Sequence, residues 1–259
     1  MLGRATLILA LAGWLLGVGQ ARAWLPQQDQ RFDAQFVTPF NLVRRVDIVV
    51  LDLFETSVAQ LAELRARGIK TVCYINAGAW ENWRPDAREY PPTVIGRAYA
   101  GWPGERWLDI RARKALEKVL RNRIELCREK GFDGVEFDNV DGYANRTGFT
   151  LSAADQLAFN RWLADQAREA KLAVALKNTL ELVPDLVQVF DFAISESCFS
   201  EGSCEALLPF REAGKAVYVI EYTNQRRKMD RYCAEAAELG LQLVFKTKSL
   251  NGKLHRRCL

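Results

Sequence analysis

Apolar runs and amphipathic stretches alternate along nearly the whole chain. The apolar runs are short and bounded by turn residues, which is typical of buried strands. Helical periodicity lies between them, as in residues 113–130, which end at Gly131, and in the stretch that begins with the capping pair Ser152 and Asp155. The predicted strands are residues 46–52, 71–76, 107–110, 134–139, 173–178, 192–196, 216–222 and 241–246.

Eight strands alternating with helices, without a linker or a change in composition, predict an α/β fold with a single (β/α)8 (TIM) barrel. The alternative is an open doubly wound sheet, which usually has a glycine-rich phosphate loop after its first strand. Residues 52–56, which follow the first predicted strand, contain no glycine. The barrel is therefore the favoured architecture.

Polar side chains gather at the C-terminal ends of the predicted strands. Residues two apart in a strand share a face, and on one face each strand changes from apolar to polar. Capping of the following helix explains one or two such ends, but not eight, two of which are lysines. In a barrel these ends meet at one mouth, the usual place of the active site. The pairs are Val50 with Asp52, Tyr74 with Asn76, Trp107 with Asp109, Glu136 with Asp138, Ala175 with Lys177, Ile194 with Glu196, Val219 with Glu221, and Val244 with Lys246.

The first 23 residues have the pattern of a signal peptide. Arg4 precedes an apolar run over residues 5–18, and Ala21-Arg22-Ala23 is a small-x-small cleavage site. A transmembrane anchor is the alternative, but the run is too short for one. We expect cleavage near Ala23, a mature domain of residues 24–259, and a secreted or periplasmic protein.

Six cysteines in an exported chain predict disulfides. Cys198 and Cys204 are close enough in sequence to close one loop. Cys73 with Cys127 and Cys233 with Cys258 are further possible pairs, although spacing alone does not decide between pairings.

The 259-residue chain contains one histidine, His255, close to the C-terminus. This excludes Ser-His-Asp and Cys-His catalysis and metal sites built on several histidines. Acid–base chemistry would therefore depend on carboxylates. The net charge of +4 is too small to indicate a nucleic acid or membrane partner, and we expect a monomer.

The acid-rich mouth suits two reaction classes. Glycoside hydrolysis needs two carboxylates, one that protonates the leaving oxygen and one that acts as nucleophile or base. Metal-dependent hydrolysis needs several oxygen ligands for a divalent cation. A non-catalytic carbohydrate-binding barrel is a third possibility.

Aromatic residues favour a sugar ligand. Trp80, Trp83, Trp102 and Trp107 all lie between the second and third predicted strands, in or just after the long connection 77–105. Loops of this length are commonly functional, and flat rings beside carboxylates suit the faces of pyranose rings. The alternative is that these rings pack against one another and form a small hydrophobic core within the loop.

Several segments together resemble glycoside hydrolase family 114, which contains endo-α-1,4-polygalactosaminidases. The resemblance extends from about Trp24 to the end of the last predicted strand. Phe137 and Ser197 depart from the family pattern, but neither change removes a carboxylate. The segments are residues 74–84, 101–111, 131–143, 176–178, 195–199 and 221–223.

The resemblance implies a barrel glycosidase that cleaves a cationic amino-sugar polysaccharide without a cofactor or metal. Its catalytic pair would be Asp138, as nucleophile by analogy with retaining α-glycosidases, and Glu196, as acid/base. Asp141 is the competing nucleophile. The expected substrate-binding or supporting residues are Asp52, Tyr74, Asn76, Trp80, Trp102, Asp109, Glu136, Asp141, Lys177, Asn178 and Glu221.

Overall fold

The computed structural model describes residues 24–222 and 226–258. The predicted signal peptide, residues 1–23, lies outside the described part of the chain. Within that part, no helix is both long and apolar enough to cross a bilayer.

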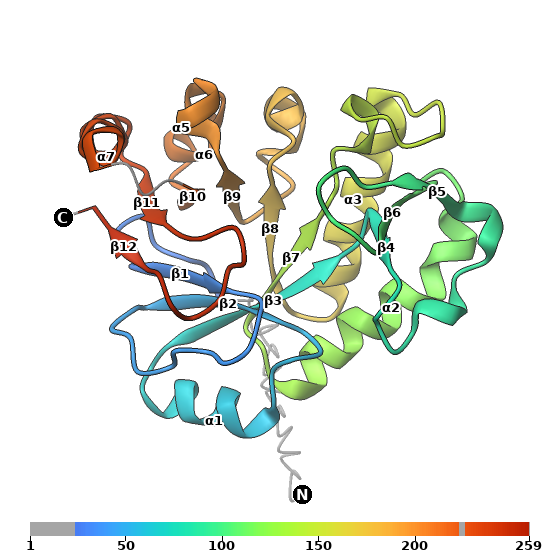
Figure 1. The fold of residues 1–259 in the computed structure, drawn as a ribbon, viewed down its shortest axis with the longest axis horizontal. Coiled ribbons are helices and arrows are strands. Elements are labelled where there is room, and N and C mark those ends of the chain that lie inside the picture. Colours follow the sequence, from blue (N-terminus) through green and yellow to red (C-terminus); the bar gives the residue numbers. More distant parts are fainter. Residues whose placement is uncertain (1–23, 223–225, 259) are drawn as a thin grey trace, which may run out of the picture.

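A curled sheet of parallel strands forms the centre of the molecule (Figure 1). Eight parallel strands are described, and a short antiparallel strand, β12 (Arg256–Arg257), follows β11 at one end. The α/β barrel prediction is confirmed. In sheet order the parallel strands are β1 (Phe32–Gln35), β2 (Ile48–Asp52), β3 (Lys70–Asn76), β7 (Gly134–Asp138), β8 (Ala173–Lys177), β9 (Phe192–Glu196), β10 (Val217–Glu221) and β11 (Gln242–Phe245).

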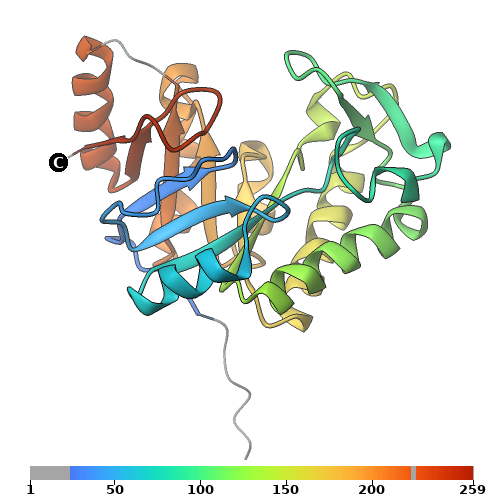
Figure 2. The same cartoon turned by 60° about the horizontal axis from the view of Figure 1, so that its bottom comes forward.

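Helices cover the outside of the curled sheet (Figure 2). Ser152 and Asp155 form the predicted capping box, and Gly131 ends the helix before β7 with φ of 92°, a conformation that glycine adopts without strain. The helices are α1 (Val58–Ala66), α2 (Arg113–Lys130), α3 (Ala153–Glu169), α4 (Val183–Leu186), α5 (Cys198–Glu201), α6 (Leu208–Glu212) and α7 (Arg226–Leu239). Short 3-10 turns are η1 (Ala87–Glu89), η2 (Pro92–Val94), η3 (Gly142–Ala144), η4 (Leu180–Leu182) and η5 (Cys204–Leu207).

The third predicted strand is not a barrel strand, and the first barrel strand was not predicted. Residues 107–110 overlap β6 (Glu105–Leu108), which lies between β4 (Ala79–Glu81) and β5 (Ile95–Ala98) in a small antiparallel sheet. This sheet belongs to the long connection after β3 and stands beside the barrel (Figure 1). The missing barrel strand is β1, whose sequence Phe-Asp-Ala-Gln has no apolar run to reveal it.

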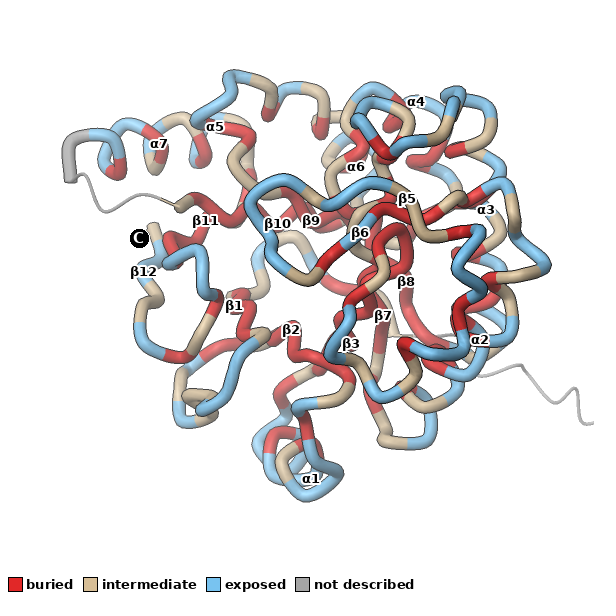
Figure 3. Tube along the Cα trace, turned by 45° about the vertical axis from the view of Figure 1, so that its right-hand side comes forward, coloured by how far each residue is buried: buried red, intermediate tan, exposed pale blue. Residues whose placement is uncertain are grey.

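Two apolar layers lie on the two faces of the barrel. Inside it, residues such as Ile48, Val72 and Ala175 form one buried cluster, and outside it the helices pack on Leu51, Ile75 and their neighbours. Figure 3 shows the strands as a buried layer beneath half-exposed helices. This two-faced burial fixes which strand residues can reach the mouth.

Three disulfides connect the elements. Cys73 in β3 joins Cys127 in α2, Cys198 joins Cys204 after β9, and Cys233 in α7 joins Cys258. These are the three pairs considered from the sequence, and they suit an oxidising compartment.

A buried ion pair connects the two ends of the parallel sheet. Lys246 Nζ lies 2.5 Å from Asp33 Oδ1, and both side chains are fully buried. Asp33 also accepts a hydrogen bond from Gln35 and pairs with Arg44. Burial lowers the pKa of Lys246, which Asp33 opposes.

Lys246→Met should destabilise the protein by about 3 kcal/mol, because it leaves Asp33 buried with less compensation. Urea unfolding measures the change. The double variant Asp33→Asn, Lys246→Met should lose less stability than the single one, since it removes both fully buried charges and leaves only the partly exposed Arg44 without its partner. A Lys246→Met protein as stable as the wild type would contradict this account of barrel closure.

Candidate active site

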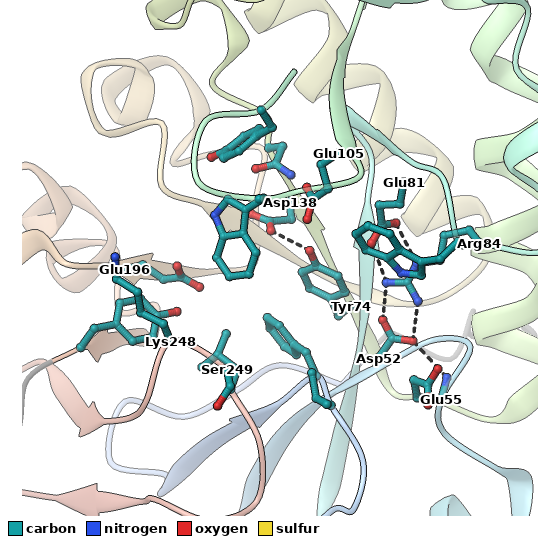
Figure 4. A pocket seen from close by; sticks show the side chains of 18 of the residues that line it. Asp52, Glu55, Tyr74, Glu81, Arg84, Glu105, Asp138, Glu196, Lys248 and Ser249 are labelled. Atoms are coloured by element: carbon teal, nitrogen blue, oxygen red, sulfur yellow. Dashed lines mark hydrogen bonds and ion pairs between the residues drawn. The ribbon is translucent and has the colours of Figure 1, made fainter. Parts of the chain in front are cut away.

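A cavity of about 430 Å³ lies at the C-terminal ends of the strands (Figure 4). Strand ends line it on several sides, including those of β2, β3, β7 and β9. The small antiparallel sheet adds one wall, and residues 248–250 after β11 add another. This is the usual place for the site of a barrel enzyme, and the volume fits a small-molecule or sugar site.

Lys177, at the end of β8, joins three carboxylates at the base of this cavity. Its Nζ lies 3.0 Å from Glu136 Oε1, 3.1 Å from Asp138 Oδ1 and 3.1 Å from Glu196 Oε1. Burial alone would lower the pKa of Lys177, but these negative charges raise it well above its ordinary value. The lysine therefore stays charged and neutralises part of the cluster.

Asp138 has a hydrogen-bond donor on each carboxylate oxygen. The Tyr74 hydroxyl donates to Oδ2 at 2.8 Å, and Lys177 Nζ donates to Oδ1 at 3.1 Å. The main chain is also fixed, because the amides of Ala77 and Gly78 both donate to the Asp138 carbonyl at 3.1 Å. A Cβ on Gly78 would lie 1.7 Å from the Asn139 carbonyl oxygen, so only glycine permits this approach.

Glu196 is positioned from the neighbouring strands. Its amide donates to Asn178 Oδ1 at 2.9 Å, and its carboxylate meets Lys177. Tyr222, after β10, also lines the cavity, and its pKa is raised by burial and by the charge of Glu196.

The three strands that carry this cluster end in the same unusual way. Asn139, Asn178 and Ser197 directly follow Asp138, Lys177 and Glu196, and all three have positive φ, at 60°, 47° and 65°. A non-glycine residue in this left-handed conformation destabilises the fold by on the order of 1–3 kcal/mol, and such residues often occur at active sites. Here they turn the chain away immediately after each charged side chain.

Glu136 lies one layer below Asp138 and is fully buried. Burial raises its pKa to about 7, although Lys177 opposes the shift. Asp141 lies beside the cluster but outside the cavity lining, and its pKa is raised to about 6 by burial and by the charge of Asp138. Both groups surround Asp138 without opening onto the cavity.

A second charged group forms the opposite wall. Arg84 Nη2 lies 2.6 Å from Asp52 Oδ2 and 2.8 Å from Glu81 Oε1. Glu105 in β6 also lines this wall, and its pKa is raised to about 7 by burial and by the charges of Glu81 and Asp138. The cavity is thus acidic on two sides, with Lys248 and Arg84 as lining cations.

Among the residues expected from the sequence, six line the cavity: Asp52, Tyr74, Trp102, Asp138, Asn178 and Glu196. Three lie behind them and contact them or their supports, namely Asn76, Glu136 and Lys177. Four others, Trp80, Asp109, Asp141 and Glu221, lie outside the lining.

The predicted inward orientation of Glu221 is wrong. Val219 packs in the outer apolar layer, so Glu221 also points outward, where it accepts hydrogen bonds from the amides of Phe199 and Ser200 at the start of α5. Tyr218 and Ile220 face the barrel interior, and Tyr222 reaches the cavity. Apolar residues occupy both faces of β10, so its pattern does not reveal which face is inside.

Asp109 and Trp80 lie in the inserted connection between β3 and α2, and their side chains contact other residues of that connection. Asp109 pairs with Arg111 at 2.9 Å, and the Trp80 indole donates to the Ala87 carbonyl at 2.9 Å. Asp109 lies outside the cavity because residues 107–110 are not in the barrel sheet.

Several lining residues were not predicted from the sequence. They lie in the insert, in the loop after β11 and just after the ends of β1, β2, β7 and β10, where strand periodicity gives no guidance. The weak signal for the insert was its length and its tryptophans. Trp83, one of the tryptophans that favoured a sugar ligand, also lines the cavity. The lining residues that were not predicted are Phe36, Val37, Glu55, Glu81, Arg84, Tyr99, Glu105, Asn139, Tyr222, Lys248, Ser249 and Leu250.

Comparison with known proteins identifies a matching family and a similar solved structure. The model of glycoside hydrolase family GH114 matches residues 16–258. The structure of Aspergillus fumigatus Ega3 in complex with galactosamine is similar with a TM-score of 0.87 and 28% identity, and covers 93% of this chain and 100% of that one.

Two further similarities are more distant, and one of them is to a solved structure. The glycoside hydrolase domain of PelA from Pseudomonas aeruginosa has a TM-score of 0.65 at 18% identity, over 87% of this chain and 97% of that one. An uncharacterized Deinococcus radiodurans protein is 25% identical over 236 residues, which is 82% of this chain and 74% of the relative.

The raised pKa of Glu136 predicts a falling stability as the pH rises from about 4.5 to about 7. In this window the folded protein retains a proton that the unfolded chain has released, so deprotonation favours unfolding. Glu136→Gln should remove on the order of 1–3 kcal/mol of this decline. Urea unfolding at several pH values compares the two proteins, and identical pH profiles would contradict the assignment.

Proposed function

Since the chain belongs to glycoside hydrolase family GH114, we propose that it cleaves α-1,4 linkages in a galactosamine-containing polysaccharide, with Asp138 and Glu196 as its catalytic carboxylates. The observation that carries this proposal is the placement of both carboxylates on one lysine at the base of the cavity. Ega3, which is 28% identical to this chain, binds galactosamine in its crystal structure.

The geometry is compatible with a retaining mechanism, which we adopt as part of the proposal. Asp138 Oδ1 and Glu196 Oε1 each lie 3.1 Å from Lys177 Nζ, so these oxygens cannot be farther apart than twice that distance. This limit applies to one oxygen of each group, and it is compatible with the roughly 5–5.5 Å between the carboxyl groups of retaining pairs.

The hydrogen bonds favour Asp138 as the nucleophile. Its two oxygens accept from Tyr74 and Lys177, which stabilises the ionised form that attack on carbon requires. Glu196 would protonate the glycosidic oxygen as Asp138 attacks C1, and the leaving chain would depart with that proton. Glu196 would then take a proton from water as the water displaces Asp138, which regenerates both groups.

The lining suits a cationic sugar chain. Carboxylates from two walls face the cavity, and Trp83 and Trp102 are half exposed at its rim. Aromatic faces pack on sugar rings, and the acids attract protonated amines. We propose that the protein acts outside the cytoplasm, which the signal-peptide pattern and the three disulfides support.

A metal-dependent reaction has less support. The position between Glu136, Asp138 and Glu196, which a divalent cation would occupy, is held by the ammonium of Lys177. Part of the charge that a metal would balance is therefore already neutralised by the chain itself.

Asp138→Asn and Glu196→Gln should each lower the release of reducing ends from partly deacetylated galactosaminogalactan by about 10²–10⁴-fold or more. Glu129→Gln, a change of an exposed carboxylate on α2 outside the cavity, is the matched control and should retain activity. Wild-type activity should resist EDTA. Full turnover by both catalytic variants, or loss of wild-type activity in EDTA, would contradict the proposal.

Azide distinguishes the roles of the two carboxylates. In Glu196→Ala, azide should attack the glycosyl–Asp138 intermediate and give the α-azide, because two displacements retain configuration. In Asp138→Ala, azide should attack the substrate directly and give the β-azide. Proton NMR of the products reads the anomeric configuration, and the opposite pattern would exchange the two roles.

A further inference from the structure

Glu105 differs from the other buried or half-buried carboxylates that line the cavity. Asp52 and Glu81 pair with Arg84, and Asp138 and Glu196 pair with Lys177. Glu105 is only 8% exposed, yet over residues 24–222 and 226–258 the structure shows no ion pair for it. A buried carboxylate without a cation is unfavourable, so its presence calls for a physical explanation.

The position of Glu105 is fixed by its neighbours. Its Oε2 accepts a hydrogen bond from Asn76 Nδ2 at 3.1 Å. Asn76 is itself held, because its Oδ1 accepts from the Ala79 amide at 2.9 Å and from Asn139 Nδ2 at 3.0 Å. In the described part of the chain, Glu105 Oε1 has no hydrogen-bond donor, and the side chain lies beside Asp138 and Glu81 at the cavity (Figure 4).

A purely structural role does not explain the charge. A glutamine at this position could accept the same bond from Asn76 without the cost of burying a carboxylate. Glu81 lies directly opposite Glu105 in the β4–β6 ladder, which adds repulsion between like charges. Both costs fall when a cation enters the cavity.

We propose that Glu105 binds the ammonium group of a galactosamine unit beside Asp138 and so selects free amino sugars over N-acetylated ones. This inference rests on the proposed function, because it concerns a substrate unit of the same cavity. A protonated amine supplies the positive charge and the donor that Glu105 Oε1 lacks. An N-acetyl group is neutral and bulkier, so it gains nothing from the carboxylate.

Binding of monosaccharides tests this inference without turnover. Isothermal titration of galactosamine and of galactose gives the ratio of the two affinities, and wild type should prefer galactosamine. Glu105→Gln, which keeps the bond to Asn76, should reduce this preference about tenfold while leaving galactose binding unchanged. Glu105→Asp, which keeps the charge, should retain part of the preference, and Glu129→Gln, a change on the outer surface of α2, should retain all of it.

The outcomes separate the two proposals. Equal preference in wild type and Glu105→Gln, or equal weakening of both sugars, would overturn the role of Glu105 even if the polysaccharide is cleaved. A wild type that binds no galactosamine would also overturn it. A reduced preference in Glu105→Gln together with no cleavage by wild type would reject the proposed function and leave amine recognition supported.

Discussion

The ammonium of Lys177 holds three carboxylates together at the base of the cavity, and the chemistry of the site depends on it. Glu136, Asp138 and Glu196 all lie within 3.1 Å of its Nζ. Without this positive charge, nothing would offset the repulsion between carboxylates so close together. One buried cation thus brings the two proposed catalytic carboxylates together at the base of the cavity.

The rest of the structure serves this arrangement from two directions. From the barrel, the strands carrying Asp138, Lys177 and Glu196 end in left-handed residues that turn the backbone away. From the insert after β3, Gly78 packs against the backbone of Asn139, and Glu81, Arg84 and Glu105 form the opposite wall. The barrel therefore supplies the proposed chemistry, and the insert supplies much of the surface that a substrate would meet.

Strand parity predicted the site wherever the two faces of a strand differ in composition. In β7, Glu136 and Asp138 are the polar residues between apolar neighbours, so the inward face is evident. In β10 both faces are apolar and the polar end residue, Glu221, points outward. The four-residue strand β1 has no recognisable apolar run, because one of its buried residues is Asp33, which pairs with Lys246 far away in the sequence. The wall formed by the insert depends on long-range folding and has no periodic signal.

The proposed mechanism depends most on Asp138 as the group that forms the covalent intermediate. The most direct measurement is mass spectrometry of Glu196→Gln after incubation with α-galactosaminyl fluoride, whose leaving group needs no proton. Fragmentation of the peptide that contains Asp138 and Asp141 then locates the sugar. We predict one galactosaminyl group on Asp138; a group on Asp141, or fluoride release with inverted sugar and no labelled peptide, would contradict the account.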